Sequence, residues 1–208
     1  MSGGQGGGKG QGRLVVVRHG QTEWSRDGKH TGRTDLPLLP EGERQAQSLQ
    51  PVLGTWDFTL VLTSPLARAA RTADLAGFPG AEPDPDLLEW DYGAYEGTRT
   101  VDVRETEPGW SIWETEVEGG EQPEQVGERV DRVIARARAS GGDVLAFAHA
   151  HVLRILAARW IDLAARGGRH LVLEPATVSV LGWERETPAL RQWNVPPAPM
   201  EAREQVTP

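Results

Sequence analysis

Two arginines and two histidines follow the apolar runs of this chain that are typical of buried strands. They are Arg18 and His19 after LVVV, Arg68 shortly after LVLTS, and His149 after VLAFA. The planar guanidinium of arginine suits phosphate oxygens, and the N-terminus of a following helix adds backbone N–H donors. These residues therefore predict an anion pocket, best suited to a phosphoryl group, in a chain whose net charge is −8.

Catalysis in such a pocket would need a nucleophile and a proton carrier. Histidine can be the nucleophile through one ring nitrogen if a hydrogen bond fixes the other nitrogen. A carboxylic acid must then protonate the departing alkoxide. The segment LLEWDYGAYEG offers Glu89, Asp91 and Glu96 for this task, and the residues alone do not choose among them.

The composition argues against several other functions. The chain has no cysteine, which excludes disulfides and thiolate metal sites. His149 and His151 flank Ala150, but zinc would need a further protein ligand there, and the arginines would repel the cation. The negative net charge argues against nucleic-acid binding. No apolar run approaches the roughly 18 residues of a membrane span, and the N-terminus lacks the apolar core of a secretory signal, so we expect a cytoplasmic protein without a membrane partner.

The elements that must position these residues alternate along the chain. Strands are expected at 13–17, 58–62, 143–148, 176–183 and 190–194, and helices at 40–50, 64–77, 123–139 and 151–163. Ser64 is expected to cap the N-terminus of the second of these helices. The alternation predicts an α/β fold with a mostly parallel central sheet flanked by helices on both faces. In such sheets, ligands gather beyond the carboxyl ends of the strands.

The length of 208 residues suggests one domain. We expect it over residues 13–195, after a disordered glycine-rich leader at 1–12 and before a loose proline-rich tail at 196–208. Residues 78–121 break the alternation and predict a long loop excursion over the active site. Within and beside it, residues 105–124 are expected to form a solvated acidic loop. The tryptophans of the excursion are expected to pack within a lid over the site.

Four blocks of sequence resemble a known family. LVVVRHGQTEW, SPLARAARTA, LEWDYGAYEG and FAHAHVLR occur in the order and approximate spacing of the histidine phosphatase superfamily, the phosphoglycerate mutase-like proteins. The resemblance spans roughly residues 13–194. It implies that His19 is the nucleophile and forms a phosphohistidine, and that Glu89 protonates the leaving group and then activates water. It also implies that the phosphoryl oxygens are held by Arg18, Arg68 and His149. It implies neither a metal nor a cofactor.

The same resemblance suggests substrate-binding positions, which are Gly20, Gln21, Thr22, Glu23 and Ala150. Gly20 would let the backbone approach closely, and the next three residues would line the pocket edge. Ala150 stands where the family usually has glycine, so it either takes an unusual backbone angle or narrows the pocket floor with its methyl group. The other polar candidates are expected to have structural or surface roles; they are His30, Arg71, Glu96, His151, Arg154 and His170.

Within the superfamily, EWDYGAYEG with GWSIW downstream resembles actinobacterial acid phosphatases and sedoheptulose-bisphosphatase-like enzymes. The true mutases carry a longer insertion before the second histidine, which limits the access of water. We therefore expect a phosphomonoester hydrolase, either of broad specificity or acting on sugar phosphates. A cofactor-dependent phosphoglycerate mutase and a non-catalytic phosphate-binding module are the alternatives.

The expected partner is a small-molecule phosphomonoester whose identity the sequence leaves open. Sugar phosphates, sugar bisphosphates and phosphoglycerate derivatives all fit the motifs. The glutamates of residues 105–121 are expected to repel a highly anionic substrate. The choice between a monomer and a homodimer is open as well.

Overall fold

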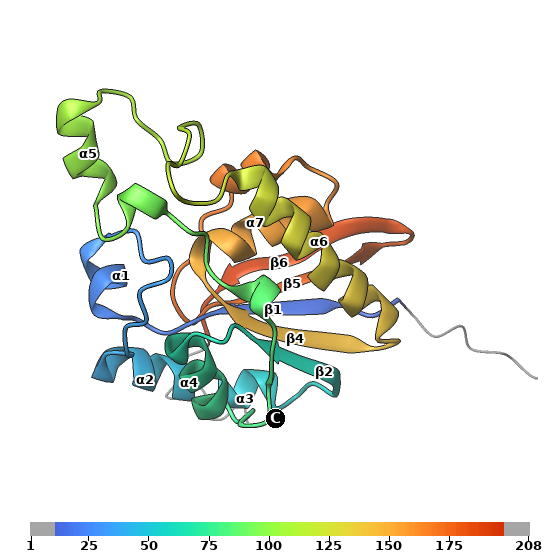
Figure 1. Ribbon diagram of the computed structural model, residues 1–208. Helices are drawn as coiled ribbons and strands as arrows, with labels where there is room; N and C mark the ends of the chain where they lie inside the picture. Colours follow the sequence, from blue (N-terminus) through green and yellow to red (C-terminus); the bar gives the residue numbers. More distant parts are fainter. Residues whose placement is uncertain (1–10, 198–208) are drawn as a thin grey trace, which may run out of the picture.

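A computed structural model describes residues 11–197 as one six-stranded sheet with helices on both faces (Figure 1). The strands are β1 (Leu14–Arg18), β2 (Phe58–Thr63), β3 (Glu82–Pro83), β4 (Asp143–Ala148), β5 (Val178–Glu184) and β6 (Thr187–Val195). Their order in the sheet is β3-β2-β4-β1-β5-β6. Strands β1 to β4 pair in parallel, and only β5 runs antiparallel to its two neighbours. The predicted α/β fold with a mostly parallel sheet is confirmed.

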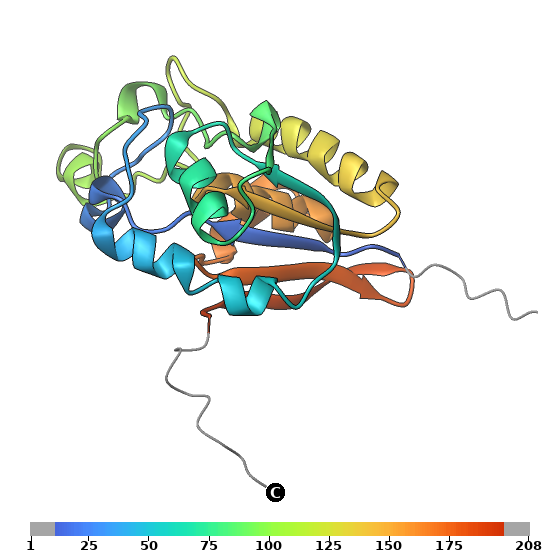
Figure 2. The same cartoon turned by 90° about the horizontal axis from the view of Figure 1, so that it is seen from below.

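The helices form two layers around this sheet. They are α1 (Glu23–Asp27), α2 (Pro40–Gln47), α3 (Gln50–Leu53), α4 (Ala67–Leu75), α5 (Thr100–Thr106), α6 (Pro123–Ala139) and α7 (Ala150–Trp160). Short 3-10 turns occupy Pro85–Leu87 (η1), Gly93–Tyr95 (η2) and Ala165–His170 (η3). Figures 1 and 2 show α6 and α7 on one face of the sheet and α2, α3 and α4 on the other, while α5 stands apart from both layers.

The two layers explain the apolar run of β1. Leu14 and Val16 join a core cluster with residues of α6 and α7, whereas Val15 and Val17 join the cluster beneath α3 and α4. All four side chains are fully buried. Because successive strand residues face opposite sides, a strand covered on both faces has no polar positions to alternate with.

The helix expected over 151–163 ends at Trp160, and two others differ more from the prediction. Proline explains the first of these. The helix expected over 40–50 ends at Gln47 and a separate turn, α3, follows, because Pro51 has no N–H to continue the first helix. The helix expected over 64–77 begins only at Ala67, with Leu66 at the N-cap position. Ser64 is therefore not its cap. Instead, the carboxylate of Asp35 accepts the Ala67 N–H, with both oxygens at 3.0–3.1 Å.

The excursion over 78–121 is more ordered than expected. It contains β3, η1, η2 and α5. Its apolar side chains join the main core cluster; they are Leu87, Trp90, Tyr92, Trp110, Ile112, Trp113 and Val117. The expected packing of the tryptophans is thus observed, but the expectation of a solvated loop over 105–124 is wrong for its centre. Large aromatic side chains account for the difference, because their burial outweighs the polarity of the glutamates between them.

The two chain ends lie largely outside the described residues. The predicted leader (1–12) and tail (196–208) fall mostly on residues 1–10 and 198–208, so the domain boundaries stay predictions. Gly12 is described, and its carbonyl oxygen accepts a hydrogen bond from the Trp183 indole at 3.0 Å. Among the helices of residues 11–197, none has the length and apolar character needed to cross a membrane.

Candidate active site

The register of the central strands brings three polar residues together at one sheet edge. Arg18 pairs with Ala148, and Thr63 pairs with Phe147, so the residues that follow these strands are neighbours. His19 donates its backbone N–H to Ala148, and Ser64 donates to Phe147, at 2.9 and 2.8 Å. The rings of His19 and His149 lie with their centroids 5.1 Å apart. Parallel strand ends therefore create the predicted gathering of side chains.

His19 is held as a neutral imidazole with one free nitrogen. Its Nδ1 lies 2.7 Å from the Gly20 carbonyl oxygen, which can only accept, so Nδ1 carries the proton and Nε2 keeps its lone pair. Burial holds the pKa of His19 well below its usual value, and the charges of Arg68 and Arg18 lower it further. The ring is 4% exposed and lines a cavity. This is the state that a nucleophilic histidine requires.

His149 lies behind His19 and is fixed from both sides. Arg68 donates from Nε to His149 Nδ1 at 3.1 Å, so the proton of His149 is on Nε2 and points at the Ser64 hydroxyl, 2.7 Å away. Burial, the Arg68 charge and neighbouring groups lower the pKa of His149 well below its usual value. Ser64 is fully buried, and the sequence analysis did not include it in the site. Its position directly after a buried strand was the one feature of the sequence that could have indicated a place in the site.

Arg68 is fully buried and uses its guanidinium to organise a loop. Besides His149, it donates to the carbonyl oxygens of Thr31, Gly32 and Thr34 at 2.8–3.2 Å. The loop is also held by Glu96, whose carboxylate accepts the N–H groups of Gly32 and Thr34. Arg68 and His149 do not reach the cavity wall in this arrangement. Their predicted contacts with phosphoryl oxygens stay predictions.

Arg18 lines the cavity and keeps one donor of its guanidinium without a partner in the described part of the chain. One terminal nitrogen donates to the Leu173 carbonyl oxygen at 2.6 Å. Its buried Nε has no hydrogen-bond partner among residues 11–197. A buried polar group left without a partner costs about 1–3 kcal/mol, so this donor is available to a group that can reach it. Burial lowers the pKa of Arg18, and the carboxylate of Glu89 opposes this shift most.

Glu89 reaches the same cavity from the excursion and is only 3% exposed. Its carboxylate accepts three backbone N–H groups, from Trp90 at 2.9 Å, Val152 at 2.8 Å and His151 at 3.1 Å. The last two belong to the first turn of α7, whose N-terminal N–H groups have no partners within the helix. Glu89 is thereby tied to the helix that follows His149.

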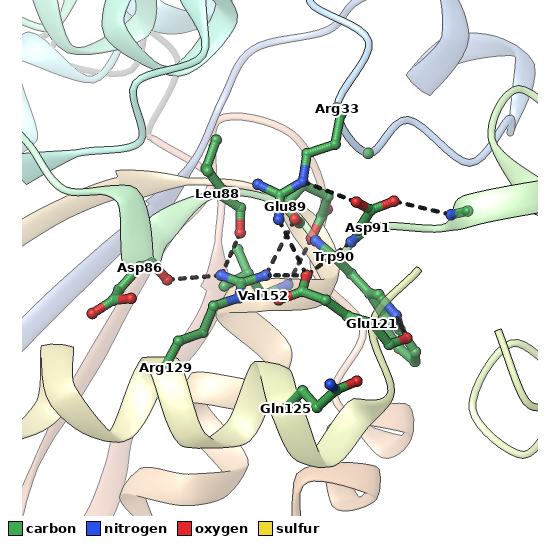
Figure 3. A network of polar contacts seen from close by, with 12 residues as sticks. Arg33, Asp86, Leu88, Glu89, Trp90, Asp91, Glu121, Gln125, Arg129 and Val152 are labelled. Atoms are coloured by element: carbon green, nitrogen blue, oxygen red, sulfur yellow. Dashed lines mark hydrogen bonds and ion pairs between the residues drawn. The ribbon is translucent and has the colours of Figure 1, made fainter. Parts of the chain in front are cut away.

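Arg129 supports Glu89 from α6. Its guanidinium donates to the backbone carbonyl of Glu89 at 3.2 Å and of Leu88 at 2.6 Å, and it pairs with Glu121 at 2.8 Å (Figure 3). Asp86 adds a third carbonyl contact at 2.7 Å. Since Arg129 is 7% exposed, this network fixes the backbone on which Glu89 stands. No local pattern could reveal these carbonyl contacts, because Leu88 and Glu89 lie 41 and 40 residues from Arg129 in the chain.

The cavity has a volume of about 430 Å³, within the range of small-molecule sites. Arg18, His19, Glu89 and Ala150 line it, together with residues for which only structural or surface roles were expected, namely His30, His151 and Arg154. His30 is 8% exposed, so its expected surface location is wrong. Burial lowers the pKa of His30 to about 4, although Glu96 opposes the shift. Its contacts with Thr98 and Thr100 are tertiary, so no local pattern could reveal them.

His151 and Arg154 line the cavity on the side of α7. His151 Nδ1 contacts the Tyr92 hydroxyl, and burial, followed by the Arg154 charge, lowers the pKa of His151 well below its usual value. Arg154 was expected to anchor its own helix, but it reaches η3 instead. It donates to the carbonyl oxygens of Gly168 and Arg169 at 3.0 Å and lies over the Trp113 ring.

Ala150 requires no unusual backbone angle, because it is the first helical residue of α7. Ala150 lines the cavity, and the narrowing of the pocket floor by its methyl group stays a prediction. The other predicted substrate-binding residues do not reach the cavity wall; they are Gly20, Gln21, Thr22 and Glu23. A Cβ on Gly20 would overlap the carbonyl oxygen of Gly42, so this close approach is to α2. Thr22 caps α1, and Glu23 is exposed.

The arrangement combines a neutral imidazole nitrogen, an unsatisfied guanidinium and a carboxylate in one cavity. In a phosphate ester, the imidazole could attack phosphorus, the guanidinium could hold the phosphoryl oxygens, and the carboxyl group, once protonated, could protonate the leaving oxygen. Within residues 11–197, no group of three or more His, Asp or Glu side chains is arranged to hold a metal ion.

Comparison with known proteins agrees with this chemistry. Residues 14–196 match the model of the histidine phosphatase superfamily, branch 1. The chain is 39% identical to an acid phosphatase of Mycobacterium tuberculosis over 176 residues, which cover 83% of this chain and 87% of that protein. It is 38% identical to sedoheptulose 1,7-bisphosphatase of Saccharomyces cerevisiae over 187 residues, which cover 74% of this chain and 69% of that protein.

A solved structure from an open reading frame of Mycobacterium tuberculosis superimposes with a TM-score of 0.85 at 36% identity, covering 89% of this chain and 98% of that one. The family model spans nearly all of the described residues. The chain therefore belongs to the histidine phosphatase superfamily, and its relatives support phosphatase activity.

Proposed function

We propose that this member of the histidine phosphatase superfamily hydrolyses small phosphomonoesters in two steps, through a phosphohistidine on His19. One observation carries the proposal: the Gly20 carbonyl fixes the proton of His19 on Nδ1, which leaves Nε2 free in a cavity that Arg18 and Glu89 also line. A nucleophile, an anion holder and a proton carrier are the three groups that phosphoryl transfer to a side chain requires.

In the first step, His19 Nε2 attacks phosphorus and the bond from phosphorus to the ester oxygen breaks. Glu89 takes up a proton when the anionic substrate binds, and it donates this proton to the departing oxygen, which leaves as an alcohol. Arg18 offers its guanidinium to the phosphoryl oxygens, where negative charge must be stabilised. In the second step, Glu89 takes a proton from water, the oxygen of that water attacks phosphorus, and the N–P bond breaks to release inorganic phosphate.

Arg68 and His149 take part from behind the nucleophile. Arg68 holds His149 by its Nδ1, and the ring of His149 packs edge-on against His19. In this position the pair orients His19 and places positive charge beside it. Direct contact with a phosphoryl group would require Arg68 to exchange one of its carbonyl partners in loop 31–34.

A substrate panel tests the reaction class. The protein is incubated with p-nitrophenyl phosphate, with sugar phosphates, and with 3-phosphoglycerate plus 2,3-bisphosphoglycerate. We expect release of inorganic phosphate, and His19→Ala should abolish it without changing the circular dichroism spectrum. Formation of 2-phosphoglycerate without phosphate release would indicate a mutase, and binding without any turnover would indicate a phosphate-binding module. The cytoplasmic location and the choice between monomer and homodimer stay predictions.

A further inference from the structure

The cavity carries more positive charge than one phosphoryl group can match. Its lining includes four cationic side chains, which are Arg18, Lys29, Arg104 and Arg154, and one carboxylate, that of Glu89. The pKa values of the lining histidines are lowered, so these rings stay neutral at neutral pH. The formal excess is three positive charges. A phosphomonoester carries about −1.5 to −2 at pH 7, so about one charge is left unmatched.

These cations also lack the ion pairs that other basic residues of the protein make. Among residues 11–197, none of the four has a carboxylate within 4.0 Å. Arginines that lie nearby but do not line the cavity are paired: Arg26 with Asp27 and Arg99 with Asp102. Within the same part of the chain, Arg138 and Arg185 are also unpaired, but only at this cavity do four such cations line one space, where a ligand can supply the counter-charge.

Two of the unpaired cations share one wall of the cavity. Lys29 lies in the segment 28–31, and Arg104 lies on α5. The two segments are joined through the backbone, because Lys29 bridges to Arg99 and the His30 N–H donates to Thr98 at 2.8 Å. Arg104 is oriented by its Nε, which donates to the Trp110 carbonyl oxygen at 2.8 Å. Its two terminal nitrogens have no protein partner among residues 11–197. Thr100 and Ser111 add hydroxyl groups to the cavity lining.

We propose that Lys29 and Arg104 form a second anion subsite, so that the enzyme prefers phosphomonoesters that carry another anionic group. The proposal rests on the proposed function, in which the scissile phosphoryl group binds at Arg18 and His19. The second group is a phosphate or a carboxylate on the same molecule, since a guanidinium and an ammonium bind both.

The glutamates that were expected to repel highly anionic substrates lie outside the cavity lining. None of the glutamates of residues 105–121 lines the cavity. Glu114 pairs with Arg166 and Arg169, and Glu121 pairs with Arg129. Part of the acidity of this segment is therefore neutralised within the protein.

The test compares substrates with one and with two anionic groups. Fructose 1,6-bisphosphate is compared with fructose 6-phosphate, and 3-phosphoglycerate with glycerol 3-phosphate, each by kcat/KM. The variants are Lys29→Met, Arg104→Gln and the double variant. Glutamine keeps an amide donor for the Trp110 carbonyl, which guards against a change in fold. Arg99→Gln is the matched control, because it removes the same charge from the same wall outside the cavity.

We expect the wild-type ratio of kcat/KM for doubly over singly anionic substrates to be about a hundred, and that of the double variant to be near one. Each single variant should lower the wild-type ratio about tenfold, mainly through KM, because hydrogen bonds to charged groups have that strength. Arg99→Gln should keep the ratio. The pair of substrates that shows the preference identifies phosphate or carboxylate as the second group.

A wild-type ratio near one, a ratio that the double variant leaves unchanged, or an equal fall in Arg99→Gln would each overturn the subsite. Hydrolysis of p-nitrophenyl phosphate separates the two proposals. If that substrate turns over while the ratio stays near one, the second subsite fails and the proposed function stands. If no phosphomonoester turns over, the proposed function itself fails.

Discussion

Replacing Glu89 by glutamine should damage two separable properties, the transfer of a proton and the N-terminal support of α7. The carboxylate accepts N–H groups from Trp90 and Val152 on Oε1 and from His151 on Oε2. Glutamine has one oxygen, which can keep the two partners of Oε1. Its NH2 group must then face the His151 N–H, so two donors meet in a buried place.

The magnitude follows from this count. One buried N–H left without an acceptor costs about 1–3 kcal/mol of unfolding free energy. For a protein of this size each kcal/mol lowers the melting temperature by about 2–4 °C, so the loss should lie between about 2 and 12 °C. The catalytic loss is larger, because general acid catalysis contributes roughly 10²–10⁴-fold.

The assay uses two leaving groups. p-Nitrophenolate leaves without needing a proton, whereas the alkoxide of glycerol 3-phosphate needs one. We expect the Glu89→Gln variant to lose at least about a hundredfold in kcat/KM for glycerol 3-phosphate, and far less in its rate of phosphohistidine formation from p-nitrophenyl phosphate. The phosphorylation step is measured as a pre-steady-state burst. Equal slowing of phosphorylation by both substrates would refute Glu89 as the leaving-group acid, and an unchanged melting temperature would refute its structural role.

Three further predictions address the supports of the site. Arg129→Met should cost about 3–5 kcal/mol in urea unfolding, because it leaves Glu121 and several carbonyl groups partly buried without their cation. Arg132→Met, which breaks an exposed pair with Asp86, should have little effect, and similar losses in both variants would contradict the network. Ser64→Ala should cost about 1–3 kcal/mol and lower kcat, since it leaves the Nε2 proton of His149 unbonded; unaltered stability would show that this hydrogen bond contributes nothing. The pKa of His30 is about 4 in the folded protein and near 6.5 in the unfolded chain, so acid protonates the unfolded chain first. The contribution of His30 to the unfolding free energy should therefore be complete above pH 6.5 and fall as the pH drops toward 4. The loss from this residue should reach about 3 kcal/mol. Urea unfolding of His30→Gln should show a shallower decline over that range, and a parallel decline would count against the burial of His30.

The parts of the fold that follow local rules could be predicted from the sequence. Residues 123–139 and 143–148 are a helix and a strand with the predicted bounds, because apolar spacing and glycine punctuation act locally. The gathering of His19 and His149 followed from their places after parallel strands. In each case neighbouring residues determine the outcome.

The remaining features depend on contacts between distant segments. Asp35, and not Ser64, caps α4, and the cap lies 32 residues away in the chain. His30 is buried because residues 98–100 pack beside it, and Arg154 reaches the carbonyl groups of η3. The composition of the excursion also did not reveal that its tryptophans enter the core. These contacts join segments that meet only in the folded protein, so local sequence patterns could not predict them.

The central claim is that His19 becomes phosphorylated during turnover. The direct measurement is to quench the enzyme during hydrolysis of p-nitrophenyl phosphate in alkali, which preserves phosphohistidine, and to locate the phosphoryl group by peptide mass spectrometry. We expect a phosphoryl group on His19 that forms in the first turnover and disappears when substrate is exhausted, with none on His149 or His151 and none in His19→Ala. Turnover without a phosphorylated His19, or a phosphoryl group on another residue, would contradict it.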